Sequence, residues 1–98
     1  MIVNTGIRPI VIEELCALAK KYDIVRLILF GSRARGDYKR TSDIDLAVTG
    51  GAFVPFALDV EEETSTLLKF DVVNLDGAVQ PELRNSILKE GKILYEKV

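Results

Sequence analysis

Apolar residues recur along the chain with two alternating periods. Over residues 8–22 they return every three to four positions, which predicts an amphipathic helix with Pro9 in its first turn. Residues 25–30 form an apolar run broken only by Arg26, a pattern typical of a central strand covered on both faces. Residues 43–49 then alternate strictly between apolar and other side chains, which indicates a strand with one buried face.

The second half of the chain repeats this change of period. The pattern predicts a helix over 55–68, a strand over 70–75, a helix over 81–90 and a short strand over 92–97. The inward positions of the first of these helices are expected to be Phe56, Val60, Thr64 and Leu67. Because helices and strands alternate, we expect an α/β (α+β) fold in which helices flank a small mixed β-sheet, with residues 1–98 forming one domain.

Composition narrows the class of protein. The chain has 98 residues, of which 48% are hydrophobic and 29% charged, as in ordinary globular domains. With 13 basic and 15 acidic residues the formal net charge is −2, which argues against bulk nucleic-acid binding. The apolar runs are too short to span a membrane. The single cysteine, Cys16, and the lack of a secretory leader favour a reducing, cytoplasmic location.

The chain contains no histidine. This excludes histidine-based zinc catalysis, histidine general bases and Ser-His-Asp triads. Any catalysis therefore has to use carboxylates, hydroxyls, cationic side chains and a metal ion that accepts oxygen ligands.

Gly31 and Ser32 directly follow the predicted central strand. A turn at that point exposes backbone N–H groups, and a glycine lets phosphate oxygens approach the backbone closely. The segment matches neither the Walker A loop nor the dinucleotide-binding glycine pattern. A Gly-Ser pair after a strand is by itself more typical of an ordinary turn.

Positive charge gathers next to this turn, in Arg33, Arg35, Lys39 and Arg40. Each of these residues taken alone fits a solvated loop. As a group beside a phosphate-binding turn they would hold the phosphates of a nucleotide. Arg33 and Arg35 are the preferred candidates because they lie nearest the turn.

Asp43 and Asp45 are two residues apart in a predicted strand, so their carboxylates share one face. Asp71 begins another predicted strand that can lie beside the first. Oxygen ligands without histidine or cysteine select Mg²⁺ or Mn²⁺, and three carboxylates would complete a two-metal site. The alternative interpretation is an exposed strand face with two ordinary acids, and a third acid at a fraying strand end.

The spacing Gly31-Ser32, ten residues, then Asp43-Ile44-Asp45 resembles the defining motif of the DNA polymerase beta-like nucleotidyltransferases. The string GSRARGDYKRTSDIDLAV is similar to the minimal nucleotidyltransferase (MNT) family almost throughout. The similarity extends to residues 70–73 and 90–96, so it covers most of the chain. It implies the polymerase beta-like nucleotidyltransferase fold.

The resemblance also implies roles for individual residues. Asp43 and Asp45 would hold two Mg²⁺ ions, with Mn²⁺ as a substitute. Asp71 would hold the catalytic ion and help to take the proton from the attacking hydroxyl. The triphosphate of ATP would bind to Gly31 and Ser32, with help from Arg35 and Arg33.

In the MNT family the partner is commonly a helical HEPN protein, an RNase toxin, and the nucleotidyltransferase is its antitoxin. The resemblance therefore implies an MntA-type antitoxin that transfers AMP from ATP to a tyrosine of the toxin. A chain of this size has too few apolar residues both to fill a core and to enclose two substrates, so we expect a partner protein or another copy to complete the cleft. Two alternatives stay open: an antitoxin that binds nucleotide but acts by contact alone, and a small-molecule nucleotidyltransferase of the aminoglycoside-modifying kind.

Overall fold

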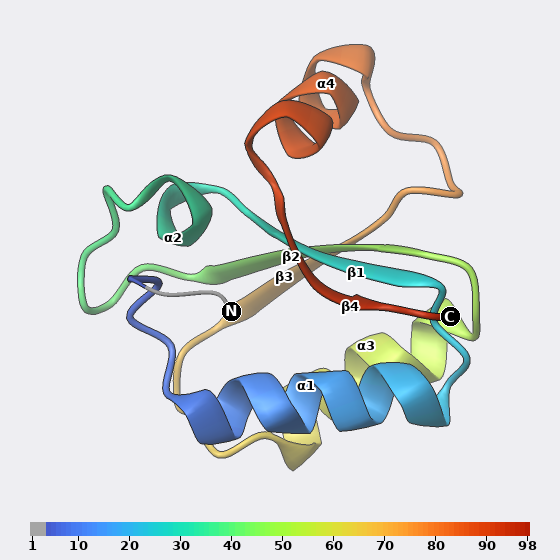
Figure 1. The fold of residues 1–98 in the computed structure, drawn as a ribbon, viewed down its shortest axis with the longest axis horizontal. Helices are drawn as coiled ribbons and strands as arrows, with labels where there is room; N and C mark the ends of the chain where they lie inside the picture. Colours follow the sequence, from blue (N-terminus) through green and yellow to red (C-terminus); the bar gives the residue numbers. More distant parts are fainter. Residues whose placement is uncertain (1–3) are drawn as a thin grey trace.

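The computed structural model describes residues 4–98, in which helices and strands alternate as the sequence predicts (Figure 1). The elements are α1 (Pro9–Lys21), β1 (Arg26–Phe30), α2 (Ser32–Arg35), β2 (Ile44–Thr49), α3 (Phe53–Glu63), β3 (Phe70–Asn74), α4 (Pro81–Glu90) and β4 (Lys92–Glu96). Within residues 4–98, no helix combines the length and the apolar character that crossing a bilayer requires.

The four strands form one mixed sheet in the order β3-β2-β1-β4. β1 is central and pairs antiparallel with both β2 and β4. β2 pairs parallel with β3, because α3 carries the chain back to the starting edge of the sheet between them. The predicted mixed sheet flanked by helices is thereby confirmed, and the apolar run over 25–30 is its central strand.

The main core lies between the sheet and the helices α1 and α3, which cover the same face (Figure 1). Alternate residues of β1 and β2 point into it, as the period of the sequence predicts. Its fully buried side chains include Leu15, Ile24, Leu27, Leu29, Ile44, Leu46, Phe56 and Val60.

The opposite face of the sheet carries α2 and α4 and a smaller apolar cluster (Figure 1). The cluster joins β1, β2 and α4 through Ile28, Phe30, Ala47, Leu75 and Ile87. Because α4 packs mainly through Ile87, one end of this face is left to polar residues. That end is where the chemistry predicted from the sequence falls.

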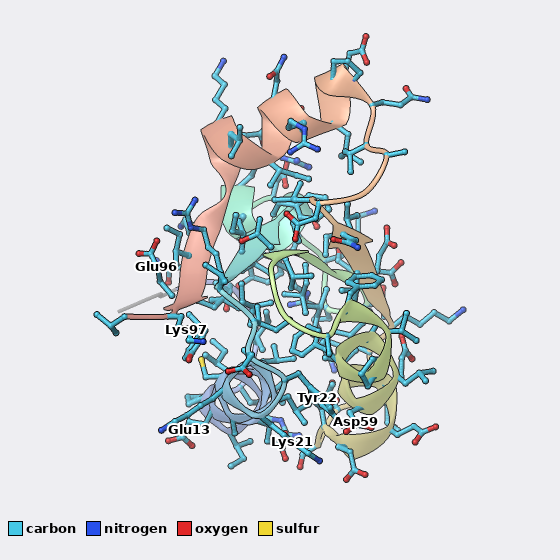
Figure 2. All side chains as sticks on the ribbon, turned by 90° about the vertical axis from the view of Figure 1, so that its right-hand side faces the viewer. Glu13, Lys21, Tyr22, Asp59, Glu96 and Lys97 are labelled. Atoms are coloured by element: carbon cyan, nitrogen blue, oxygen red, sulfur yellow. The ribbon has the colours of Figure 1, made fainter. Side chains whose placement is uncertain are left out.

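Polar contacts join α1 to α3 beside the main core. The hydroxyl of Tyr22, which follows α1, donates a hydrogen bond to the carboxylate of Asp59 in α3. Lys21 Nζ lies 3.7 Å from Asp59 Oδ2, and Figure 2 shows the three labelled side chains together where the end of α1 lies beside α3. This contact links the two helices that cover the core.

The predicted helix over 55–68 is wrong at both ends. α3 begins two residues earlier and ends at Glu63, and Leu67, expected to point inward, is fully exposed. The hydroxyl of Thr64 donates to the carbonyl of Val60, while the amide and hydroxyl of Ser65 donate to the carboxylate of Glu14. These side-chain hydrogen bonds compete with continued helical bonding and draw the chain away from the helix axis.

We expect Phe56→Ala to lower the free energy of unfolding by about 3–5 kcal/mol, because it leaves a cavity where a fully buried ring packs between α3 and the sheet. Urea denaturation followed by circular dichroism measures the change. Leu58→Ala on the same helix removes a side chain that is 58% exposed and is the matched control, with a change within about 0.5 kcal/mol. Equal losses in the two variants would contradict this assignment of the core.

Candidate active site

Two of the three candidate carboxylates lie opposite each other on neighbouring strands. In the parallel pairing of β2 with β3, Asp45 is the register partner of Asp71. Both residues follow an apolar residue of the main core, so their side chains point to the opposite face, the one that carries α2 and α4. The prediction that the strand of Asp71 lies beside the strand of Asp45 is confirmed.

The electrostatic environment of Asp45 is unfavourable for its own charge. Its side chain is half-buried, and this loss of solvation is the largest cause that raises the pKa of its carboxyl. The negative charges of Asp71 and then Asp43 raise the pKa further, and the positive charge of Arg35 opposes them. The carboxylates are therefore close enough to repel one another.

The turn after β1 brings the backbone against the same carboxylate. Gly31 has φ 74° and ψ −157°, a conformation that only glycine adopts readily. A Cβ atom at this position would lie 2.2 Å from Asp45 Oδ2, so no larger residue fits. The carbonyl of Gly31 accepts hydrogen bonds from the amides of Ala34 and Arg35, which begins α2 at Ser32.

Arg35 lies at the end of α2, close enough to Asp45 for its positive charge to lower the pKa of that carboxyl. Its Nε is 3.2 Å from Asp37 Oδ2, and its Nη1 is 3.3 Å from Glu90 Oε2 at the end of α4. The side chain is 46% exposed, so both ion pairs are solvent-accessible and contribute little to stability. The guanidinium is thus available to an anionic ligand near Asp45.

Arg33, the other arginine predicted at the phosphates, points elsewhere. Only 1% of it is exposed, and its guanidinium donates to backbone carbonyls of Thr5 and of the loop that precedes β2. A group with its donors turned into the protein is not available to a nucleotide. The sequence did not separate the two arginines, because both lie in the same short helix and only their packing differs.

Asp43 precedes the first residue of β2 and is exposed, so the loop rather than the sheet determines its position. Within residues 4–98, no three acidic, cysteine or histidine side chains converge as the ligands of one metal ion. Mutual repulsion of three like charges opposes such convergence. The three aspartates are neighbours at one end of the sheet, and their joint role as metal ligands stays a prediction.

The donor chemistry of these residues fits a hard divalent cation. All three groups are carboxylates, and the negative charges of Asp71 and Asp43, which add to the effect of burial on the pKa of Asp45, are charges that a cation would neutralise. The arrangement also has a cationic side chain, Arg35, and a glycine turn beside the same carboxylate. These are the groups that catalysis of transfer at a phosphorus atom needs.

Comparison with known proteins agrees with this chemistry. Residues 13–98 match the family model "Polymerase beta, Nucleotidyltransferase". The chain belongs to this nucleotidyltransferase family. A protein of Methanocaldococcus jannaschii that bears the name "putative protein adenylyltransferase" is 37% identical to it over an alignment 95 residues long. The alignment covers 85% of this chain and 92% of that protein.

Two solved structures have a similar fold. A crystal structure of a toxin-antitoxin with AMP-PNP superimposes with a TM-score of 0.72 at 23% identity, over 88% of this chain and 73% of that chain. A mutant of the toxin-antitoxin MntA-HpeT superimposes with a TM-score of 0.70 at 21% identity, over the same shares, 88% and 73%. At 21–23% identity these two superpositions support the fold alone. It is the nucleotidyltransferase fold that the sequence motif predicts.

Sequence reasoning missed Glu90 as a partner of the site. It reaches Arg35 from 55 positions away along the chain, and no local pattern indicates that contact. Asp37, by contrast, is two residues from Arg35 and was open to prediction from charge alone.

We expect Asp45→Asn to raise the free energy of unfolding of the metal-free nucleotidyltransferase at neutral pH, because it removes a charge that burial and then the neighbouring aspartates make unfavourable. The pKa of Asp45 is higher in the folded than in the unfolded chain. The folded state therefore binds the proton more readily, and the destabilisation by the charged carboxylate disappears as the pH falls through the folded pKa. Urea denaturation at several pH values should show the advantage of the variant shrinking toward about pH 4, the usual pKa of an unfolded aspartate.

The control is Glu62→Gln, which removes an exposed carboxylate of α3 on the other side of the sheet. We expect no comparable pH-dependent difference for it. A stabilisation by Asp45→Asn that is equal at acid and neutral pH would rule out the charge of Asp45 as its cause.

Proposed function

We propose that the chain is a Mg²⁺-dependent nucleotidyltransferase that transfers AMP from ATP to a tyrosine hydroxyl of a cognate HEPN toxin and so acts as its antitoxin. Membership of the nucleotidyltransferase family and the identity to a named adenylyltransferase support the reaction class. The observation that carries the proposal is the opposition of Asp45 and Asp71 beside the glycine turn at Gly31.

In this proposal Asp43 and Asp45 hold both metal ions and Asp71 holds the catalytic one, with Mn²⁺ able to replace Mg²⁺. The bound ions supply charge stabilisation for the phosphates and the reacting oxygens. The sheet holds two of these three aspartates side by side, since Asp45 and Asp71 are register partners in the pairing of β2 with β3.

The triphosphate binds at Gly31 and Ser32. Gly31 allows phosphate oxygens to approach the backbone, and the hydroxyl of Ser32 donates a hydrogen bond. Arg35 exchanges its exposed ion pairs with Asp37 and Glu90 for the phosphates, which offer a more concentrated negative charge. Arg33 has no part in phosphate binding because its donors are engaged inside the protein.

The transfer joins the tyrosine oxygen to the α-phosphorus and breaks the bond from that phosphorus to the oxygen that bridges to the β-phosphate. Pyrophosphate leaves with the electron pair of the broken bond. The carboxylate of Asp71 accepts the proton of the attacking hydroxyl, directly or through water. The turn and Arg35 hold the leaving group in line with the attacking oxygen.

Two other functions are distinguishable by experiment. An antitoxin that acts by contact alone would bind nucleotide and inhibit its partner without modifying it. A small-molecule nucleotidyltransferase would label an aminoglycoside-like acceptor in the presence of a partner subunit. ATP labelled at the α-phosphate separates the three, because the label goes to the toxin, to nothing, or to the small molecule.

We expect Asp43→Asn and Asp45→Asn each to reduce transfer of labelled AMP to a co-purified HEPN partner by at least about 1,000-fold, because each removes a ligand charge while retaining side-chain shape. Circular dichroism should show an unchanged fold. Glu62→Gln is the control and should transfer at the wild-type rate. Full transfer by either aspartate variant would refute the assignment of the site.

Divalent metal should stabilise the wild-type chain, since it relieves the repulsion around Asp45. At a concentration 100 times its Kd, a ligand that binds only the folded state adds about 2.7 kcal/mol to the free energy of unfolding. Thermal unfolding with Mn²⁺ or Mg²⁺, with and without ATP, measures the shift. A melting temperature that does not respond to millimolar metal, while Asp45→Asn does raise stability, would contradict a metal site.

A further inference from the structure

Arg33 is the largest fully buried side chain of the described residues, and its charge faces backbone oxygens. Its Nη1 donates to the carbonyl of Thr5 at 2.9 Å. Its Nε and Nη2 both donate to the carbonyl of Ser42, at 3.1 and 2.9 Å. Nη2 also lies within hydrogen-bond distance of the carbonyls of Arg40 and Lys39, at 3.2 and 3.4 Å.

An aromatic ring and a glycine complete this environment. The guanidinium carbon of Arg33 lies 5.0 Å from the centre of the Tyr38 ring, a cation–π contact. A Cβ atom at Gly6 would lie 2.4 Å from the Tyr38 ring and 2.7 Å from Arg33 Nη1. The segment before α1 therefore packs directly against the arginine, and the guanidinium is enclosed on several sides.

The loop from Asp37 to Asp43 has no helix or strand to satisfy its carbonyls. The guanidinium of Arg33 donates to the carbonyls of three residues of this loop, Lys39, Arg40 and Ser42, and the carbonyl of Lys39 also accepts from the amide of Ser42 at 3.0 Å. Ser42 completes the loop, as its hydroxyl oxygen accepts a hydrogen bond from the amide of Lys39 at 2.8 Å. These contacts within the loop form a turn, and Arg33 joins that turn to α2.

The contacts of Arg33 with the loop over 37–43 matter for the candidate site because of where Arg33 lies in the chain. Arg33 follows Ser32 of the proposed phosphate-binding turn, and Ser42 precedes Asp43. One side chain therefore ties the turn to the residue before Asp43, a proposed metal ligand. Asp45 and Asp71 do not need it, because strand pairing holds them.

We propose that Arg33 is a positioning residue that holds the loop over 37–43 so that the carboxylate of Asp43 joins Asp45 at the metal. This inference rests on the proposed function, in which Asp43 is a metal ligand. Lysine cannot take over the role, because a single ammonium cannot direct donors to Thr5 and Ser42 in the fixed fork of a guanidinium.

The test is a titration of the metal-free chain with Mn²⁺, with the free ion followed by electron paramagnetic resonance. It compares the wild type with Arg33→Lys, Asp43→Asn and the double variant. We expect Arg33→Lys to weaken Mn²⁺ affinity by about 10–100-fold, the range found for groups that orient metal ligands. In the double variant the affinity should equal that of Asp43→Asn alone, because the arginine acts through that carboxylate.

Arg26→Lys is the matched control. Arg26 is a half-buried arginine of β1 whose guanidinium pairs with Glu96 at the other end of that strand from the turn. We expect it to bind Mn²⁺ as the wild type does. If replacing any arginine by lysine weakened Mn²⁺ binding through a general loss of stability, Arg26→Lys would show a weakened affinity as well.

The outcomes separate the two proposals. Unchanged affinity in Arg33→Lys with weakened affinity in Asp43→Asn overturns the positioning role alone. The same conclusion follows if the losses multiply in the double variant, since a purely structural role predicts independent effects. Wild-type affinity in Asp43→Asn removes Asp43 from the ligand set and overturns the proposed metal site together with this inference.

If Arg33→Lys fails to fold, Tyr38→Leu continues the test, because it retains the arginine and removes only the ring beside it. We expect a smaller loss of Mn²⁺ affinity, about tenfold or less, that also disappears in the Asp43→Asn background. Wild-type affinity in Tyr38→Leu, or a loss that persists without Asp43, would overturn the proposal.

Discussion

The parallel pairing of β2 with β3 is the constraint on which the site depends. It places Asp45 opposite Asp71, although burial and like charge both make that arrangement unfavourable. The sheet maintains the pairing because the opposite face of the same strands is fixed in the main core by Ile44 and Leu46. The main core lies on one face of the sheet and the candidate site on the other, because the side chains of β2 and β3 alternate between the two faces.

Helices cover the two faces of the sheet to different extents. α1 and α3 cover the core face, whereas α4 packs on the other face mainly through Ile87 and leaves the end with the aspartates to the short α2 and its loop (Figure 1). A charged group at the covered face would need a buried partner. At the less covered face, Asp45 keeps contact with solvent and Arg35 remains accessible to an anion. The candidate site therefore lies on the face of the sheet that has the smaller apolar cluster.

Residues of the site are held in two different ways. Asp45 and Asp71 belong to strands, and their positions follow from backbone pairing. Asp43 and Arg35 lie outside the sheet: the carbonyl of Ser42, which precedes Asp43, accepts hydrogen bonds from Arg33, and Arg35 pairs with Glu90.

Periodicity over a few residues was enough to predict most elements and the mixed sheet, and motif spacing brought Gly31 and Asp45 to attention. The role of Asp71 came from the family resemblance, and only the pairing of β2 with β3 places it beside Asp45. Local sequence failed where side chains compete with the backbone, as at Thr64, where the predicted helix over 55–68 ends early at Glu63. It also could not distinguish Arg33 from Arg35. Both are arginines of one helical turn, and only the packing of distant segments buries the first among carbonyls and leaves the second exposed beside the carboxylates.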